Sequence, residues 1–539
     1  MKDDIETKEK QEYLRINILE KGYDADEFME YLETLRGEKG LQIESWSKND
    51  LIKAVQEFTR INPRNDELPK KENNQLINSS INNNIDNNLN NNINNSINNN
   101  DIQNQNIPNN VINNNDDNNN SKNIPNEIKF NNEEIIKCKI SEITEISTKN
   151  NIEIVISEPK VIEGGFFTKS YVTYLIRTFP LKFEVRRRFS DFEWLRNILM
   201  TQYINCIIPP VYKKNYYLGN NYKDSVTNKR IRILEKFMME LITHPLLRNN
   251  QILYDFISVK DEKEFNSKKS SYNKIQSPTK VEDIKTLNGE INIGVDNQKS
   301  SMAENIKNIC DTNQDLMKKL SKEYKLLNLK FEEVNSKIND IFSIWDELYK
   351  KSQDIESLTI SSIYDAMAKF MEDWKKMNES QIKLINIKIR EYFRYIRNEY
   401  KSIREYYDIY DNAKNQYLKS YIKLIDTKEY LFNNEDIENW GINKEDIIDR
   451  RILLKNKEYS FSKMMPDETK KVDEYKKMYG CYLNSLIDEF NEIKNYNGIR
   501  HKDNITKYIR ENIDNLTNFH VSLTNLLGYI DMFKEENFK

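Results

Sequence analysis

The C-terminal half of the chain carries apolar residues in alternating steps of three and four. One series runs from Leu316 to Leu348, a second from Ile385 to Leu424, and a third starts at Val472. This spacing lines one side of a helix with apolar side chains and is typical of helices packed as coiled coils. A helix of about 65 residues is roughly 100 Å long and rarely stable alone, so we expect an extended bundle or an oligomer.

Residues 127–260 follow a different pattern, in which apolar and polar positions alternate. The stretches IEIVISEP, SYVTYLIRTF and LKFEVRRRF predict a small antiparallel sheet. DFEWLRNILM predicts a helix, and the proline-bearing loop IIPPVYKKNYYLG and a second helix in NKRIRILEKFMMELITHP follow it. We therefore expect a domain of sheet and helices here, distinct from the long helices further on.

The remaining segments are less regular. Residues 1–62 show helical spacing with a candidate N-cap at Ser47, and we interpret them as a small helical module. It is either a docking module for a partner or a hairpin with no separate task. Residues 63–126 are mostly asparagine, a poor helix former, and are expected to be a disordered linker. Residues 261–298 are expected to be a polar linker, in which QSPTK makes Ser277 a candidate phosphorylation site.

The formal net charge of −4 over 539 residues provides no overall field that would attract nucleic acid or a membrane. Local patches must supply any such attraction, and residues 127–260 hold 21 Lys and Arg against 15 Asp and Glu. We expect no nucleic-acid partner. The N-terminus has no apolar signal core and no long apolar run occurs in the chain, so contact with a membrane would be at its surface.

Four widely spaced cysteines and three histidines argue against a disulfide framework and a zinc site, and they fit a reducing intracellular compartment. The sequence shows no nucleophile beside a base, no glycine loop that would cradle a phosphate and no paired carboxylates. We therefore expect that the chain is not an enzyme and holds neither a cofactor nor a metal.

The densest cationic cluster lies in EVRRRFSDFEWL, residues 184–195, where a strand ends and a helix begins. Side chains alternate along a strand, so Arg186 and Arg188 share one face and Arg187 points to the other. An arginine, an aromatic ring and a helix N-terminus at one junction suit a phosphate on a ring-shaped head group. The alternative is a solvated strand end, whose arginines pair with Glu184, Asp191 and Glu193.

Three motifs in order, residues 184–195, IIPPVYKK and RIRILEKFMMELITHP, resemble those of the phox-homology (PX) domain family. The resemblance covers about Glu127 to Lys260. It implies an α+β fold, with a three-stranded antiparallel sheet against helices. It also implies binding of phosphoinositides, usually phosphatidylinositol 3-phosphate.

The same resemblance implies roles for single residues. Arg188 would bind the 3-phosphate, and Phe189 would stack on the inositol ring. Arg230 would hold the 4- and 5-hydroxyls, whereas Arg232 is expected to be a solvated charge.

The lysine that meets the 1-phosphate maps to Lys214, with Lys213 as the alternative, because Tyr212 stands where the family often has proline. An apolar tip follows this basic loop. Such a tip would enter the lipid interface, or else pack against the next helix. It consists of Tyr216, Tyr217 and Leu218.

A PX domain followed by long heptad helices is similar to the PX-BAR arrangement of sorting nexins. The stretch NYNGIRHKDNITKYIRENIDNLTNFHVSLTNLL resembles the last BAR helix of that group. The resemblance implies an elongated three-helix coiled coil over 299–539, with helices near 299–356, 359–431 and 466–533, that forms a homodimer or pairs with a related chain. Its tip would carry a membrane-facing basic cluster of Arg450, Arg451, Lys455 and Lys457.

These observations predict a peripheral membrane protein of the cytoplasm that binds phosphatidylinositol 3-phosphate on endosomes and takes part in sorting or tubulation. Residues 301–539 hold 40 Lys and Arg against 42 Asp and Glu, so a basic membrane-facing surface requires segregation of charge between faces. The contrasting hypothesis is a cytosolic coiled-coil scaffold whose PX domain binds proteins.

Overall fold

The computed structural model describes most of the chain outside the asparagine-rich stretch. The described residues form two compact units, one with the N-terminal helices and one that begins at the first strand. They are residues 6, 9–10, 12–21, 23, 25–36, 45–61, 134–149, 151–163, 170–211, 224–353, 358–442 and 450–532.

The N-terminal unit packs three helical segments around one aromatic ring. The Phe58 ring lies 5.1 Å from the Phe28 ring and 5.9 Å from the Tyr23 ring, centroid to centroid. The hydroxyl of Ser47 accepts a hydrogen bond from the backbone N–H of Asp50, as expected of an N-cap. The segments are a π-helix, η1 (Arg15–Glu20), and the helices α2 (Ala25–Arg36) and α3 (Lys48–Ile61).

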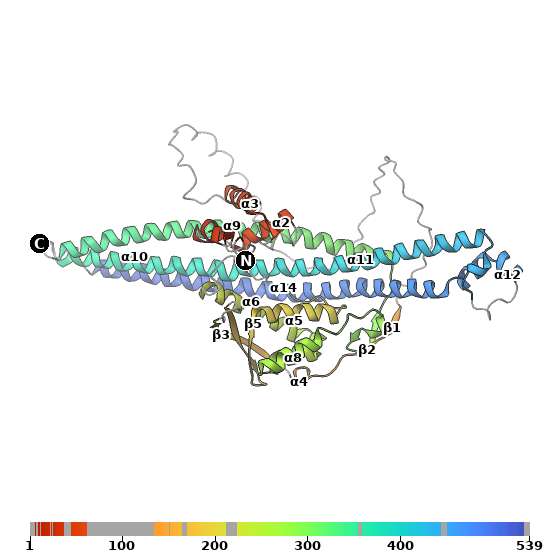
Figure 1. Cartoon of the computed structure of the whole chain (residues 1–539). Coiled ribbons are helices and arrows are strands. Elements are labelled where there is room, and N and C mark those ends of the chain that lie inside the picture. Colours follow the sequence, from red (N-terminus) through yellow and green to blue (C-terminus); the bar gives the residue numbers. More distant parts are fainter. Residues whose placement is uncertain are drawn as a thin grey trace, which may run out of the picture. The chain divides into compact units, whose positions relative to one another are not determined.

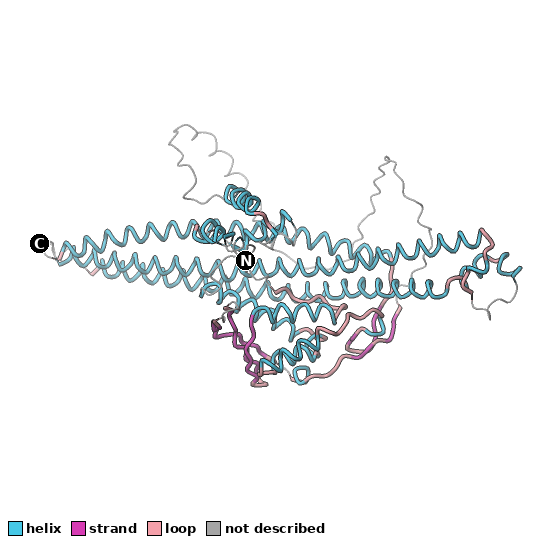
Figure 2. The backbone as a smooth tube through the Cα atoms, viewed as in Figure 1, coloured by secondary structure: helices cyan, strands magenta, loops and turns pink. Residues whose placement is uncertain are grey.

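Residues 127–260, called the PX segment below after the family they resemble, contain a three-stranded antiparallel sheet in the order β3-β4-β5, which confirms the expected sheet. Alternate residues of the central strand, from Val172 to Thr178, are buried, because one face packs on the helices. Figure 2 shows these strands gathered below the long helices. The strands are β3 (Glu153–Ile162), β4 (Tyr171–Phe179) and β5 (Phe183–Arg188).

Helices complete the PX core. Phe192, Phe237 and Phe256 are fully buried against the sheet, each from a different helix. The helices are α4 (Glu145–Thr148), α5 (Phe189–Gln202), α6 (Asp224–Thr243), the 3-10 turn η4 (Leu247–Asn249), α7 (Gln251–Ser258) and α8 (Glu262–Tyr272).

The three long helices are present close to their expected bounds and lie side by side as a rod (Figure 1). The second is a single continuous helix in which a π-helical turn joins two α-helical parts. Asp296 caps the first helix by accepting from the backbone N–H of Lys299 at 2.6 Å. The helices are α9 (Asn297–Ser352), α10 (Leu358–Leu384) with η6 (Ile385–Glu391) and α11 (Tyr392–Asn433), and α14 (Pro466–Asp531).

The tip of the rod between α11 and α14 has a small core of its own. Trp440 is fully buried, stacks on Phe432 at 5.8 Å and donates its indole N–H to the carbonyl of Leu431. The tip contains the 3-10 turn η7 (Ile437–Asn439) and the short helices α12 (Arg450–Lys455) and α13 (Lys457–Lys463).

The segment 261–298, expected to be a polar linker, does join the PX segment to the rod, but it is folded. Helix α8 buries Phe265 in the PX core, and Ile284 and Ile293 pack near Cys481 of α14. Its few apolar residues find partners far away in the sequence, which the local composition could not reveal. Two strand pairs add to the order: β6 (Lys285–Thr286) with β2 (Lys139–Ile140), and β7 (Glu290–Asn292) with β1 (Ile135–Lys137).

Candidate functional site

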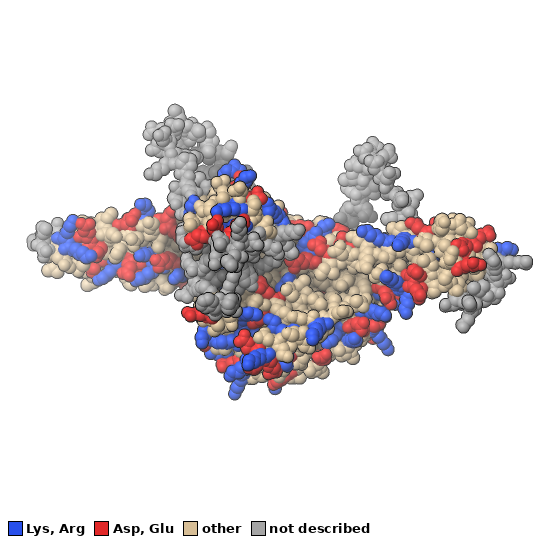
Figure 3. Space-filling model, viewed as in Figure 1, with Lys and Arg blue, Asp and Glu red and all other residues tan. Residues whose placement is uncertain are grey.

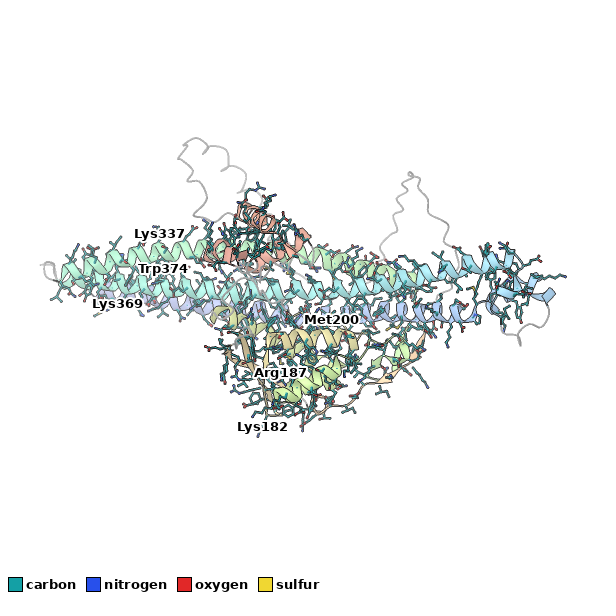
Figure 4. All side chains as sticks on the ribbon, in the orientation of Figure 1. Lys182, Arg187, Met200, Lys337, Lys369 and Trp374 are labelled. Carbon is teal, nitrogen blue, oxygen red and sulfur yellow. The ribbon has the colours of Figure 1, made fainter. Side chains whose placement is uncertain are left out.

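The three consecutive arginines of β5 occupy different environments, as the alternation of a strand requires. Arg187 is only 2 % exposed, and its guanidinium donates to the carbonyls of Phe256 and Val259 at 3.0 and 2.6 Å. The guanidinium also lies 3.8 Å over the Phe265 ring. Burial lowers the pKa of Arg187 to about 10. Arg187 therefore fastens strand β5 to helices α7 and α8, below the rod in Figure 4, and is not available to a ligand.

Arg188 lies on the opposite face, at the N-cap position of α5, with 48 % of its side chain exposed. Its ion pair with Asp191 is long, at 3.5 Å, and the same Asp191 oxygen accepts from Lys269 at 2.8 Å. Glu184, an alternative partner by sequence, pairs instead with Arg177 at 2.9 Å. The structure thus leaves Arg188 weakly paired where the dipole of helix α5 favours an anion.

Phe189 and Arg230 come together although they are 41 positions apart in the sequence. The Arg230 guanidinium lies 5.5 Å from the centroid of the Phe189 ring, whose side chain belongs to the PX core and is 4 % exposed. Burial raises the pKa of the neighbouring Tyr174, and the positive charge of Arg230 opposes this shift. Because Arg188 precedes Phe189 directly, three of the predicted binding residues lie at one junction of β5, α5 and α6.

Other predicted residues fall outside the described part of the chain. Lys214, its alternative Lys213 and the apolar tip of Tyr216, Tyr217 and Leu218 are not described. At the rod tip, the backbone of α12 is described but not the side chains of Arg450 and Arg451. Lys455 is exposed, whereas Lys457 pairs with Glu429 at 3.0 Å, so this part of the basic cluster is partly neutralised.

The PX segment is fastened to the rod by charged contacts that local sequence patterns did not reveal. Arg232 was expected to be a solvated charge, and this is wrong. Its guanidinium makes two hydrogen bonds to the Glu391 carboxylate, at 2.8 and 2.7 Å. The sequence could not predict this ion pair, because Glu391 is 159 positions away and no residue near Arg232 indicates such a partner.

A buried ionic cluster lies between α6 of the PX segment and the rod. Arg500 of α14 bridges Glu240 of α6 and Glu399 of α11, and Tyr395 donates its hydroxyl proton to Glu240. Burial and the charge of Glu399 raise the pKa of Glu240 to about 7, although Arg500 opposes the shift. Burial also lowers the pKa of Lys236, which lies over the Tyr395 ring, to about 8.

One cluster has the residue types of a metal site. Potential ligand atoms of Cys206, His244 and Glu489 lie within 4.8 Å of one another. However, Nδ1 of His244 accepts from the backbone N–H groups of Leu246 and Leu247 at 3.3 and 3.2 Å. These contacts place the imidazole proton on Nε2, which donates to Glu489 at 3.1 Å. A metal ion would have to bind the lone pair of Nε2, but this nitrogen carries the proton. The contact of His244 with Glu489 therefore fits a hydrogen bond between the PX domain and the rod.

The surface of the rod carries charges of both signs. Figure 3 shows Lys and Arg interspersed with Asp and Glu along its visible face. Exposed apolar residues occur on α9 and on the C-terminal part of α14, among them Val334, Ile344, Ile513 and Leu516. Among the described residues, no helix is both long and apolar enough to cross a bilayer.

Comparison with known proteins agrees with this architecture. The PX domain family model matches residues 180–260. Sorting nexin-4 of Neurospora crassa is 34 % identical over 149 residues, which cover 26 % of this chain and 30 % of that protein. Sorting nexin-4 of Komagataella pastoris is 24 % identical over 375 residues, 67 % of this chain and 50 % of that protein. Mouse sorting nexin-30 is 33 % identical over 102 residues, 17 % of this chain and 23 % of that protein.

The matched regions therefore span half or less of these relatives. Among solved structures, the cryo-EM structure of the SNX-BAR Mvp1 tetramer superposes with a TM-score of 0.51 at 15 % identity. The superposition covers 70 % of this chain and 99 % of that one. This likeness shows the fold, a PX domain with a helical BAR domain.

Proposed function

The family match, the relatives and the fold support a sorting nexin with PX and BAR domains, and we propose that it binds phosphatidylinositol 3-phosphate on endosomal membranes. The PX domain would hold the head group while the chain remains peripheral to the bilayer, on its cytoplasmic side. The observation that carries this proposal is Arg188, half exposed at the N-terminus of α5 and next to the pair of Phe189 and Arg230.

A phosphate group fits Arg188 for a physical reason. The arginine can exchange its long contact with Asp191 for bidentate hydrogen bonds to a dianion, and Lys269 continues to neutralise Asp191. The helix N-terminus adds favourable partial charge at the same place. Arg230, above the Phe189 ring, supplies further donors for hydroxyl groups of the inositol ring.

Flotation of the full chain with liposomes tests this site. Arg188→Ala should reduce binding to liposomes with phosphatidylinositol 3-phosphate roughly tenfold or more, since charged hydrogen bonds are lost. Arg177→Ala is the matched control, because Arg177 lies in the same sheet but is fully engaged by Glu158 and Glu184. Wild-type flotation of the Arg188 variant would show that the site is wrongly assigned.

We also propose that the rod pairs with a second copy or a related PX-BAR chain. The support is the number of exposed apolar side chains on α9 and α14, which a single chain leaves in water. A dimer presents two head-group pockets to one membrane, and the second engagement then becomes intramolecular. Such a dimer would help to sort cargo or form tubules.

A second candidate function is a cytosolic coiled-coil scaffold whose PX domain binds proteins. The mixed charge on the face of the rod seen in Figure 3 favours it, because a membrane-binding face requires a surplus of Lys and Arg. The liposome experiment separates the two functions: a scaffold would remain in the unbound fraction with every lipid composition.

A further inference from the structure

The segment between α8 and β6 contains the single Ser or Thr in this chain that is followed by proline, Ser277. Its neighbours Gln276 and Thr279 are exposed, as Ser277 is, and residues 275–279 have no regular secondary structure. The segment is held on both sides. Asn273 accepts from the Trp194 indole at 2.8 Å, and Lys280 pairs with Glu474 at 3.7 Å.

Ser277 lines a cavity of about 310 Å³ between the PX domain and the rod. Met200 of α5 and Ile409 of α11 form parts of its wall, and Figure 4 shows Met200 where α5 meets the rod. The cationic residue of the lining is Arg196. A phosphate ester is much smaller than this space, so the cavity can admit one attached to Ser277.

Arg196 also links the PX domain to helix α11 of the rod by hydrogen bonds. Its Nη2 donates to the hydroxyl of Ser402 and to the carboxylate of Glu405, both on α11, at 3.1 and 3.0 Å. Its Nε donates to the carbonyl of Pro209. An anion that enters the cavity therefore meets a guanidinium that already has one carboxylate partner.

We propose that Ser277 is a phosphorylation site for a proline-directed protein kinase and that its phosphate draws Arg196 away from Glu405. The Ser277 hydroxyl oxygen attacks the γ-phosphorus of the kinase's ATP. The new O–P bond forms as the bond to ADP breaks, and the hydroxyl proton passes to the kinase's base and then to water. A phosphate carries nearly two negative charges and three acceptor oxygens, so it outcompetes a single carboxylate for the guanidinium.

The consequence is a looser contact between the PX domain and α11 near Ser402. Other ties remain, including Arg232 with Glu391 and Arg500 with Glu240, so the domains stay docked. Phosphorylation thus weakens one of the several contacts between the PX domain and the rod. This inference goes beyond the proposed function and needs neither a lipid nor a dimer.

The first test is incorporation of phosphate into the full chain by a recombinant proline-directed kinase with Mg-ATP, followed by mass spectrometry. We expect about one phosphate per chain, on Ser277, and its loss in Ser277→Ala. Thr279→Ala is the control, because it alters the same exposed segment and keeps the Ser-Pro pair. Absence of phosphate from the wild-type chain, or equal incorporation into Ser277→Ala, would overturn the proposal.

The second test is hydrogen exchange of the phosphorylated and unphosphorylated chains. Exchange in the α11 region around Ser402 and Glu405 should become roughly fivefold faster after phosphorylation, the effect of losing one partly buried charge pair. In Arg196→Ala the serine should still be phosphorylated, but exchange should be equally fast before and after. Phosphorylation that leaves exchange in wild-type α11 unchanged would refute the role of Arg196.

Discussion

Two parts of the rod have the same spacing of apolar residues but differ in burial. The inner segment consists of residues 400–424 of α11 and 472–490 of α14, and it buries a stack of tyrosines. The ring centroids of Tyr410 and Tyr417 lie 5.8 and 5.9 Å from that of Tyr479. The outer segment, residues 316–348 of α9 with 499–527 of α14, leaves Ile513 55 % and Leu516 63 % exposed.

The outer segment does have a core within the chain. The Phe519 ring lies 5.7 Å from Phe370 and 5.8 Å from Trp374 of α10, the latter labelled in Figure 4. Some apolar residues of the outer segment are therefore covered within the chain, whereas Ile513 and Leu516 are exposed. A heptad pattern thus identifies an apolar stripe but not the partner that covers it, which can be in the same chain or in another.

The largest effect should come from opening the core of the inner segment. Tyr410→Ala removes a side chain that is 1 % exposed and stacked on Tyr479, and it should destabilise the fold by about 3–5 kcal/mol. Denaturant unfolding measures the change. Tyr421→Ala, at a half-buried position of the same helix, should cost clearly less. Equal losses would mean that the inner segment is not a closed core.

The next effect concerns the exposed apolar residues of the outer segment. Replacing Ile513 and Leu516 together by Asp should weaken dimerisation roughly 30-fold or more, because charges would have to be buried at an apolar contact. Analytical ultracentrifugation of the full chain is the measurement, with Thr517→Asp, an exposed polar position, as the control. A wild-type chain that sediments as a folded monomer would contradict the proposed pairing altogether.

Between the two segments, the buried charges that hold the PX domain should make stability depend on pH. The folded pKa of Glu240, about 7, lies above its ordinary value of 4.5, so protonation favours the folded state. This contribution is complete below about pH 4.5 and is lost as the pH rises through about 7.

Glu240→Gln should remove that dependence, a difference on the order of 2 kcal/mol between acid and neutral pH. Urea unfolding of both proteins at a series of pH values from about 5 to 8 measures it. Parallel curves for the wild type and the variant would show that Glu240 is ionised throughout this range.

The smallest effect is expected from an exposed ion pair of the outer segment. Lys337, labelled in Figure 4, pairs with Asp340 at 2.9 Å, with 79 % of its side chain exposed. Lys337→Ala should change the free energy of unfolding by less than about 0.5 kcal/mol, since solvent screens such pairs. A larger loss would indicate that a partner covers this position, and would extend the contact surface of the outer segment to it.

The candidate site was predictable in part because its residues follow a local order. The strand period assigned opposite faces to Arg187 and Arg188, and the structure confirms this. The sequence of β5 alone could not show which of the two arginines would be buried. The burial of Arg187 depends on the carbonyls of Phe256 and Val259, about 70 positions later. The error at Arg232 has the same cause, a partner on another domain.

The sequence was enough to predict the strands of the PX segment, the three long helices and the place where an arginine, an aromatic ring and a helix N-terminus meet. These features depend on the periodicity of apolar residues and on neighbours within a few positions, so the local sequence is sufficient to predict them. The three-dimensional structure was needed to show that 261–298 is folded and that Ile513 and Leu516 of the outer segment are exposed. It was also needed to show that Arg196, Arg232 and Arg500 make contacts between the PX domain and the rod. Such contacts join residues 100 or more positions apart, and their energy depends on burial and distance rather than on local sequence.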